Sequence, residues 1–121
     1  MKPEKIRLAA KLASFADRWS PKIVADVNDH QIRVAKVRGE FVWHKHDRED
    51  ELFLVLAGRL TIRFRDGDVT LDPGELVVVP KGVEHCPAAD EEAEILLFEP
   101  RSTLNTGDVV NERTVATLDR I

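Results

Sequence analysis

The feature that most constrains the fold of this chain is a series of short apolar segments separated by turn-forming residues. Between Lys22 and Glu99, clusters of Asn, Asp, Gly and Pro stand between runs rich in Val, Ile, Leu and Phe. Such runs, bounded by turn residues, are typical of the strands of a β-sandwich or barrel. We expect strands at 22–27, 31–38, 41–46, 52–56, 60–65, 69–71, 76–79 and 94–99.

The N-terminal part has a different periodicity. Alanines and Ile6 recur at helical spacing over residues 3–17, which predicts an amphipathic helix that ends before Ser20-Pro21. The sequence therefore predicts an all-β protein with a short N-terminal helix, organised as one domain over residues 1–121. We expect the barrel at about 22–100 and an extended tail at 101–121.

Three of the four histidines form a second pattern with one carboxylate. On a strand, His44 and His46 point to the same face, about 6.6 Å apart along the chain. Glu51 follows an acidic turn and begins the next expected strand, so a hairpin could return it beside the histidines, and His85 follows the turn at 80–82. Imidazoles with a carboxylate suit first-row divalent metals, although paired histidines on a strand are also common on half-exposed faces without a metal.

At these positions the chain resembles the cupin superfamily, whose two motifs have fixed spacings. The first is matched by Gly39, His44, His46, Glu51 and Gly58, and the second by Gly74, Pro80, Gly82 and His85. Two positions depart from the pattern: Gly39 lies one residue too close to His44, and Ala89 replaces an asparagine. The resemblance implies a double-stranded β-helix, or jelly-roll barrel. It also implies that His44, His46, Glu51 and His85 bind one divalent transition metal, which could be iron, manganese, nickel, copper or zinc.

More narrowly, segments 19–22, 39–43, 105–108 and 112–114 resemble a group of small bacterial single-domain cupins. Such proteins are often labelled mannose-6-phosphate-isomerase-like, a label that reflects fold and fixes no reaction. Phosphate recognition would need basic groups inside the barrel, whereas the arginines of 59–65 alternate toward the outside. The segment 105–114 could pack along the barrel, against a neighbouring subunit, or over the barrel mouth.

Strand parity predicts which side chains surround the metal. If Glu51 points inward, Phe53 and Val55 do so too, and Val42 shares the side of the two histidines. We therefore expect Val42, Phe53 and Val55 to line an apolar pocket. The alternate residues Leu52, Leu54 and Leu56 then need a cover on the outer face, either the N-terminal helix or a second subunit. Small cupins commonly dimerise, which favours a homodimer.

Composition limits the remaining partners and the compartment. The net charge is −4 and there is no basic arm, so we expect no nucleic-acid partner. No signal peptide and no apolar run long enough for a bilayer are present, so we expect no membrane partner and a cytoplasmic location. Cys86 is the only cysteine and cannot form an internal disulfide, which fits a reducing compartment.

Two classes of function remain open from sequence. The chain could be an enzyme that acts on a small oxygen-chelating molecule at a mononuclear metal, as a dioxygenase, isomerase or decarboxylase. Alternatively, it could be a binding module that holds a small molecule without turnover. No catalytic base besides the expected metal ligands can be identified, because Glu49 and Asp50 lie on a turn of uncertain direction.

Overall fold

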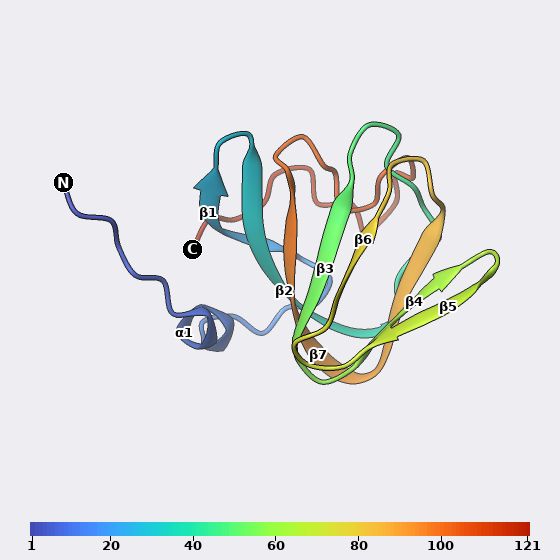
Figure 1. Ribbon diagram of the computed structural model, residues 1–121, viewed down its shortest axis with the longest axis horizontal. Coiled ribbons are helices and arrows are strands. Elements are labelled where there is room, and N and C mark those ends of the chain that lie inside the picture. Colours follow the sequence, from blue (N-terminus) through green and yellow to red (C-terminus); the bar gives the residue numbers. More distant parts are fainter.

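The computed structural model describes residues 1–121 and shows an antiparallel jelly-roll barrel with one short helix (Figure 1). This is the all-β fold class that the sequence predicts. The elements follow in the order α1 (Leu8–Ala13), β1 (Lys22–Val27), β2 (His30–Glu40), β3 (Glu51–Ala57), β4 (Leu60–Phe64), β5 (Gly67–Leu71), β6 (Leu76–Val79) and β7 (His85–Pro100). The main sheet has the strand order β1-β2-β7-β3-β6, and β4 pairs with both β5 and β7.

The longest strand, β7, joins the two halves of the barrel. Its first part pairs with β4, and its second part runs between β2 and β3. The apolar pattern predicts only the second part, 94–99, because Pro87 and the acidic residues 90–92 interrupt it. A single strand therefore contributes residues to the barrel interior from His85 at its start to Glu99 near its end.

The core lies on the inner face of β3, β7 and β2. Strand register places side chains of the three strands in rows: Val55 with Ile95 and Ala35, then Phe53 with Leu97 and Arg33. All six side chains are buried. From β4, the predicted inward residues Leu60 and Ile62 complete the core, and both have no exposed surface.

The N-terminal helix is shorter than the predicted range 3–17. Only Leu8–Ala13 is helical, and Leu12 is its buried residue. Leu12 packs with Val24 and Val34 on the outer face of the sheet. Because a helix this short depends on tertiary packing, only the turn that contacts the sheet is formed. Ser14 ends it by donating its hydroxyl to the carbonyl oxygen of Lys11 at 2.6 Å.

The segment 41–46, predicted as a strand, is irregular and is attached by a single bridge. The backbone N–H of His44 donates to the carbonyl of His85 at 3.0 Å, and the reverse bond is 2.9 Å long. Without a continuous ladder, strict alternation does not extend through the whole segment: His44 and His46 both reach the interior, but Phe41 lines the cavity in place of Val42. No helix of the structure has the length and apolar character that a bilayer crossing requires.

Candidate metal centre

The four residues predicted as metal ligands come together inside the barrel. His44 and His46 belong to the irregular segment before β3, Glu51 is the first residue of β3, and His85 is the first residue of β7. All four are buried, with at most 4% of their surface exposed. One potential ligand atom from each residue lies within 4.8 Å of those of the other three. The structure therefore forms a cluster of three histidines and one glutamate that is suited to a metal ion.

The spacing within the cluster fits a transition metal. The Nε2 atoms of His46 and His85 each lie 3.2 Å from the same oxygen, Glu51 Oε1. Metal–ligand bonds of about 2.0–2.2 Å place neighbouring ligand atoms at right angles about 3 Å apart. Ligand atoms at this separation can surround one ion without moving far.

Hydrogen bonds to the backbone set the orientation of two imidazole rings. His44 Nδ1 lies 2.8 Å from the carbonyl oxygen of Val42, and His85 Nδ1 lies 2.9 Å from that of Val83. A carbonyl only accepts, so Nδ1 carries the proton in each ring and Nε2 keeps its lone pair for a metal. Nδ1 of His46 is buried without a hydrogen-bond partner, and its Nε2 has only the 3.2 Å contact with Glu51 Oε1. This arrangement also fits a metal site.

Burial and the Glu51 charge give the histidines different protonation behaviour. Burial lowers the pKa of His44 to about 4, and the charge of His85 acts in the same direction. Burial also acts to lower the pKa of His46, but hydrogen bonding and attraction to Glu51 outweigh it and raise that pKa. The same interactions with His46 and His85 overcome burial and hold the pKa of Glu51 well below its usual range. The site thus keeps an anionic carboxylate beside His44 in its neutral, ligating form.

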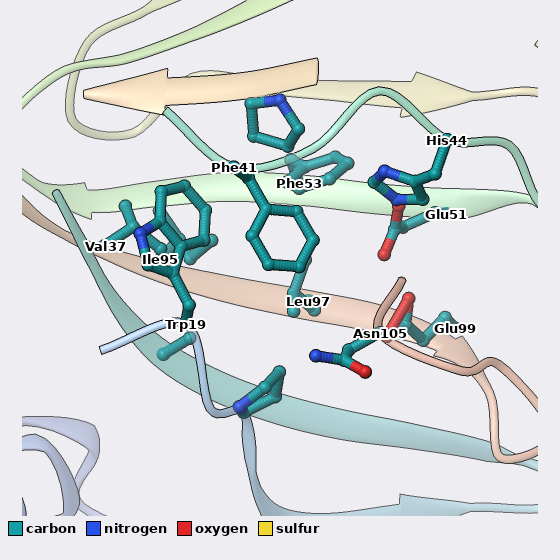
Figure 2. A pocket seen from close by; sticks show the side chains of 13 residues that line it. Trp19, Val37, Phe41, His44, Glu51, Phe53, Ile95, Leu97, Glu99 and Asn105 are labelled. Atoms are coloured by element: carbon teal, nitrogen blue, oxygen red, sulfur yellow. The ribbon is translucent and has the colours of Figure 1, made fainter. Parts of the chain in front are cut away.

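A second buried carboxylate, Glu99, faces Glu51 (Figure 2). Arg33 donates from Nη1 to Glu99 Oε1 at 2.8 Å, and both side chains are almost fully buried, with 2% and 1% exposed. Arg33 also donates to Gln31 and to the carbonyls of residues 101 and 103. Burial and the negative charge of Glu51 raise the pKa of Glu99 well above its ordinary range, and Arg33 opposes this only in part.

Neither Glu99 nor Arg33 was predicted from the sequence, although strand parity contains a signal for both. Glu99 continues the inward alternation of Ile95 and Leu97, and Arg33 shares the parity of Ala35. A charged residue in register with core residues is a candidate for the barrel interior.

A narrow cavity of about 40 Å³ opens beside the cluster (Figure 2). By the same measure a single water needs about 10–15 Å³, so the space suits a small molecule. Its polar wall contains His44, Glu51, Glu99 and Asn105, and its apolar wall includes Trp19, Phe41, Phe53, Ile95 and Leu97.

Of the three residues expected to line the pocket, only Phe53 does so. Val55 lies further along β3 and is buried in the core. Val42 is half-buried outside the cavity, because the irregular backbone turns Phe41 inward in its place. The expectation for Val42 relied on a regular strand that the structure does not have.

Two stacked aromatic rings form part of the apolar wall of the cavity. Trp19 and Phe41 stack with ring centroids 4.7 Å apart, and Trp19 Nε1 donates to the carbonyl of Arg38 at 2.8 Å. Trp19 has a φ of +58°, a conformation that is unfavourable for a bulky residue. Strain of this kind is maintained by surrounding structure and is concentrated at functional sites.

The C-terminal tail holds the histidine segment in place. Asp108 accepts a bond from the backbone N–H of Lys45 at 2.9 Å and donates its own N–H to the Lys45 carbonyl at 3.0 Å. Gly107 lies so close that a Cβ there would overlap the Lys45 carbonyl oxygen and crowd the His44 ring. The tail then returns to β1, where Arg120 bridges to Ile23. It therefore packs along the barrel and against the candidate ligands.

Residues 31–99 match the family described as the cupin domain. This range covers more than half of the chain and contains β3 to β6, nearly all of β2 and β7, and all four clustered residues. The chain therefore belongs to the cupin family, as its motifs suggest.

Similar proteins support the same assignment. A cupin-2 domain containing protein from Shewanella frigidimarina NCIMB 400 is 50% identical, with a TM-score of 0.79, over 79% of this chain and 94% of that one. Protein NMB1881 from Neisseria meningitidis is 32% identical, with a TM-score of 0.74, over 80% of this chain and 99% of that one. The uncharacterised protein YdbB of Bacillus subtilis (strain 168) is 43% identical over 63 residues, which span 51% of this chain and 56% of the relative.

Proposed function

We propose that this protein is a mononuclear metalloenzyme that acts on a small organic molecule able to bind a metal through oxygen. The observation that carries the proposal is the buried cluster of three histidines and one glutamate at the polar end of an otherwise apolar cavity. Burying polar side chains without full partners is unfavourable, and His46 Nε2 has only its 3.2 Å contact with Glu51 Oε1. A divalent cation bound by all four residues would give this nitrogen and the carboxylate a shared partner.

A bound transition metal would supply a Lewis acid or a redox centre, with coordination positions open beside four protein ligands. The residues of the chain orient and enclose the reactants. The carbonyls of Val42 and Val83 hold the rings of His44 and His85 in their ligating orientation. Phe53 and Phe41 exclude water from the cavity and favour a ligand with an apolar body.

The first test is the metal content of the protein purified without chelators. We expect close to one transition metal ion per chain by inductively coupled plasma mass spectrometry. Glu51→Ala should reduce this ratio under mild chelation, whereas Glu94→Ala, a change on the outer face of β7, should not. A wild-type protein that binds none of iron, manganese, nickel, copper or zinc would reject the proposed centre.

The second test separates an enzyme from a binding module. Protein loaded with each metal is incubated with catechol, a vicinal diol, a keto acid and a hydroxyketone, while oxygen uptake and product formation are followed. Turnover that is lost in Glu51→Ala supports an enzyme. Tight binding without turnover under every metal would favour the non-catalytic alternative, and turnover that survives loss of the metal would contradict the mechanism.

A further inference from the structure

Asn105 is the one residue of the cavity wall whose side chain still has a hydrogen to donate. Two other wall residues carry side-chain N–H groups, and both use them on backbone carbonyls: Trp19 at 2.8 Å and His44 at 2.8 Å. The two carboxyl groups of the wall, Glu51 and Glu99, are hydrogen-bonded to each other, so a proton carried by the pair lies between them. Every remaining residue of the wall has an apolar side chain.

The contacts of Asn105 within the tail fix the orientation of its amide. Oδ1 accepts from the backbone N–H of Val115 at 2.9 Å, and Nδ2 donates to the carbonyl of Arg113 at 2.8 Å. A flipped amide would place donor against donor and acceptor against acceptor, so the positions of the nitrogen and the oxygen are determined. Figure 2 shows the side chain extending from the tail into the cavity with the nitrogen at its leading end.

The amide nitrogen is only half used by the protein. Nδ2 carries two hydrogens, and the carbonyl of Arg113 accepts one of them. The second hydrogen has no partner in the chain. It is a neutral donor at a wall that otherwise offers acceptor oxygens, the metal cluster and apolar carbon.

We infer that Asn105 is a ligand-binding residue: its second Nδ2–H donates to a carbonyl oxygen of the molecule whose other oxygens bind at the metal. This inference rests on the proposed metal centre and narrows the class of its ligand. A carbonyl that enters the cavity loses its bonds to water, and a buried carbonyl without a donor is unfavourable. Away from the metal, Asn105 supplies the only side-chain donor that replaces those bonds.

The inference separates chelating ligands that differ in a single group. A ligand with adjacent oxygens for the metal and a further carbonyl satisfies both the metal and Asn105. A ligand with a methyl group in place of that carbonyl fits the same apolar space but leaves the amide hydrogen unpaired. Because the amide is neutral, Asn105 selects for a hydrogen-bond acceptor and not for a charge.

The test compares catechols that differ only in this group. One pair is 2,3-dihydroxybenzaldehyde and 3-methylcatechol, and the second pair carries the same two groups at the adjacent ring position. Zinc-loaded wild type and Asn105→Leu are titrated calorimetrically with each probe. The ratio of the two dissociation constants within a pair is compared between the proteins, because this ratio cancels the intrinsic difference in metal affinity between the probes.

We expect the preference for the carbonyl probe to fall roughly 2- to 10-fold in Asn105→Leu for at least one pair, the loss of one neutral hydrogen bond. Thr114→Val is the matched control. Thr114 holds the same tail through Thr106 at 2.7 Å and the N–H of Asn111 at 3.0 Å, but it does not line the cavity. This variant should keep the wild-type ratio, because a loosened tail weakens both probes of a pair alike.

A second variant covers the case in which Asn105→Leu does not fold. Asn105→Asp retains an oxygen for the N–H of Val115 and has no amide hydrogen, so it should lose the same preference. Wild-type ratios in the variant for both pairs, at equal zinc content, would overturn the role of Asn105 and leave the metal centre standing. Zinc-loaded wild type that binds none of the four probes would overturn it too. A wild-type protein that binds no zinc would reject the centre and this inference together.

Discussion

The inner and outer faces of the same strands differ in where their polar and apolar side chains lie. On the inner face of β3 and β7, the apolar rows end in polar residues, where Glu51 and Glu99 lie one step beyond the last paired row. On the outer face, cross-strand pairing forms two rows of uncharged side chains, and each row spans four strands. These are Val78 with Leu52, Phe98 and Ile32, and Leu76 with Leu54, Leu96 and Val34.

Each face contains residues that an isolated barrel would not favour. A cluster of three histidines and one glutamate is unfavourable in the interior unless it has partners, and a row of leucines is unfavourable in water. The inner polar end therefore indicates a ligand. On the outer face, α1 covers Val34, whereas Leu76 and Val78 remain 55% and 48% exposed. We propose that the uncovered part packs against the same face of a second copy of the chain.

The largest expected effect is on the free energy of unfolding. It distinguishes Val55 from its neighbour Leu54, which points to the opposite face of β3. Val55 has no exposed surface, so Val55→Glu would bury an unpaired charge and should cost more than about 4 kcal/mol, a large part of the stability of a domain. Leu54→Glu should leave the fold intact and convert the dimer to a monomer. Circular dichroism reports the fold, and light scattering reports the mass.

Two results would break this comparison. A wild-type protein that is monomeric at micromolar concentration would mean that no second copy covers the outer leucines. If Leu54→Glu unfolds the protein as completely as Val55→Glu does, Leu54 belongs to a core rather than to an interface.

The next largest effect is on metal binding at the polar end of the inner face. Replacing His44 or His46 by Ala should remove the metal under mild chelation, with a loss larger than the roughly 10- to 100-fold caused by losing a supporting contact. His30→Ala is the matched control, because His30 stacks on Phe98 of the outer face, with ring centroids 5.1 Å apart. Metal-to-protein ratios of dialysed samples give the result. Full metal content in the His46→Ala protein would remove this histidine from the ligand set.

Much of the fold could be predicted because it depends on local patterns, and the histidine cluster because the chain carries the motifs of the cupin superfamily. Turn residues mark the strand ends, and alternation in β4 predicts correctly that Leu60 and Ile62 are buried. The structure brings His44, His46, Glu51 and His85 together, as the resemblance to the cupin motifs implies.

The missed features depend on contacts between distant segments. Trp19 and Asn105 reach the cavity from outside the strands, and neither has a periodic pattern that points to it. Arg33 bonds the carbonyl of Thr103 across 70 residues of sequence. Val42 was placed wrongly because the bridge at His44 replaces a regular strand. Long-range packing, rather than local propensity, decides these positions.

A smaller effect on stability and metal binding is expected from the C-terminal tail. The tail contacts the polar end of the inner face, so a change in it tests whether that end needs outside support. Gly107 has a φ of +56°, and Gly39 has +80° with no atom within 4 Å of an added Cβ. Both Gly→Ala changes introduce backbone strain of about 1–2 kcal/mol. Gly107→Ala adds overlap with the Lys45 carbonyl, which should cost about 1–3 kcal/mol more.

Urea unfolding of both variants measures the difference, and metal retention shows where it acts. We expect Gly107→Ala to lose metal more readily than Gly39→Ala, because the overlap displaces the segment that carries His44 and His46. Equal stability and equal metal retention in the two variants would show that the tail does not support the site.

The smallest effect is the pH dependence of the metal-free protein. The pKa of His44 is lowered to about 4 by burial and by His85, whereas an unfolded histidine titrates near 6.5. Between these values the unfolded chain binds a proton that the folded chain does not, so the free energy of unfolding falls as the pH falls from about 6.5 to 4. The loss should be at most about 3 kcal/mol, and the raised pKa of His46 offsets part of it, because that group favours the folded state at lower pH.

Urea unfolding after chelation, at pH 7.5 and 4.5, should show a weaker pH dependence in His44→Gln than in the wild type. The same dependence in both proteins would mean that His44 is not the group that resists protonation at the polar end of the inner face.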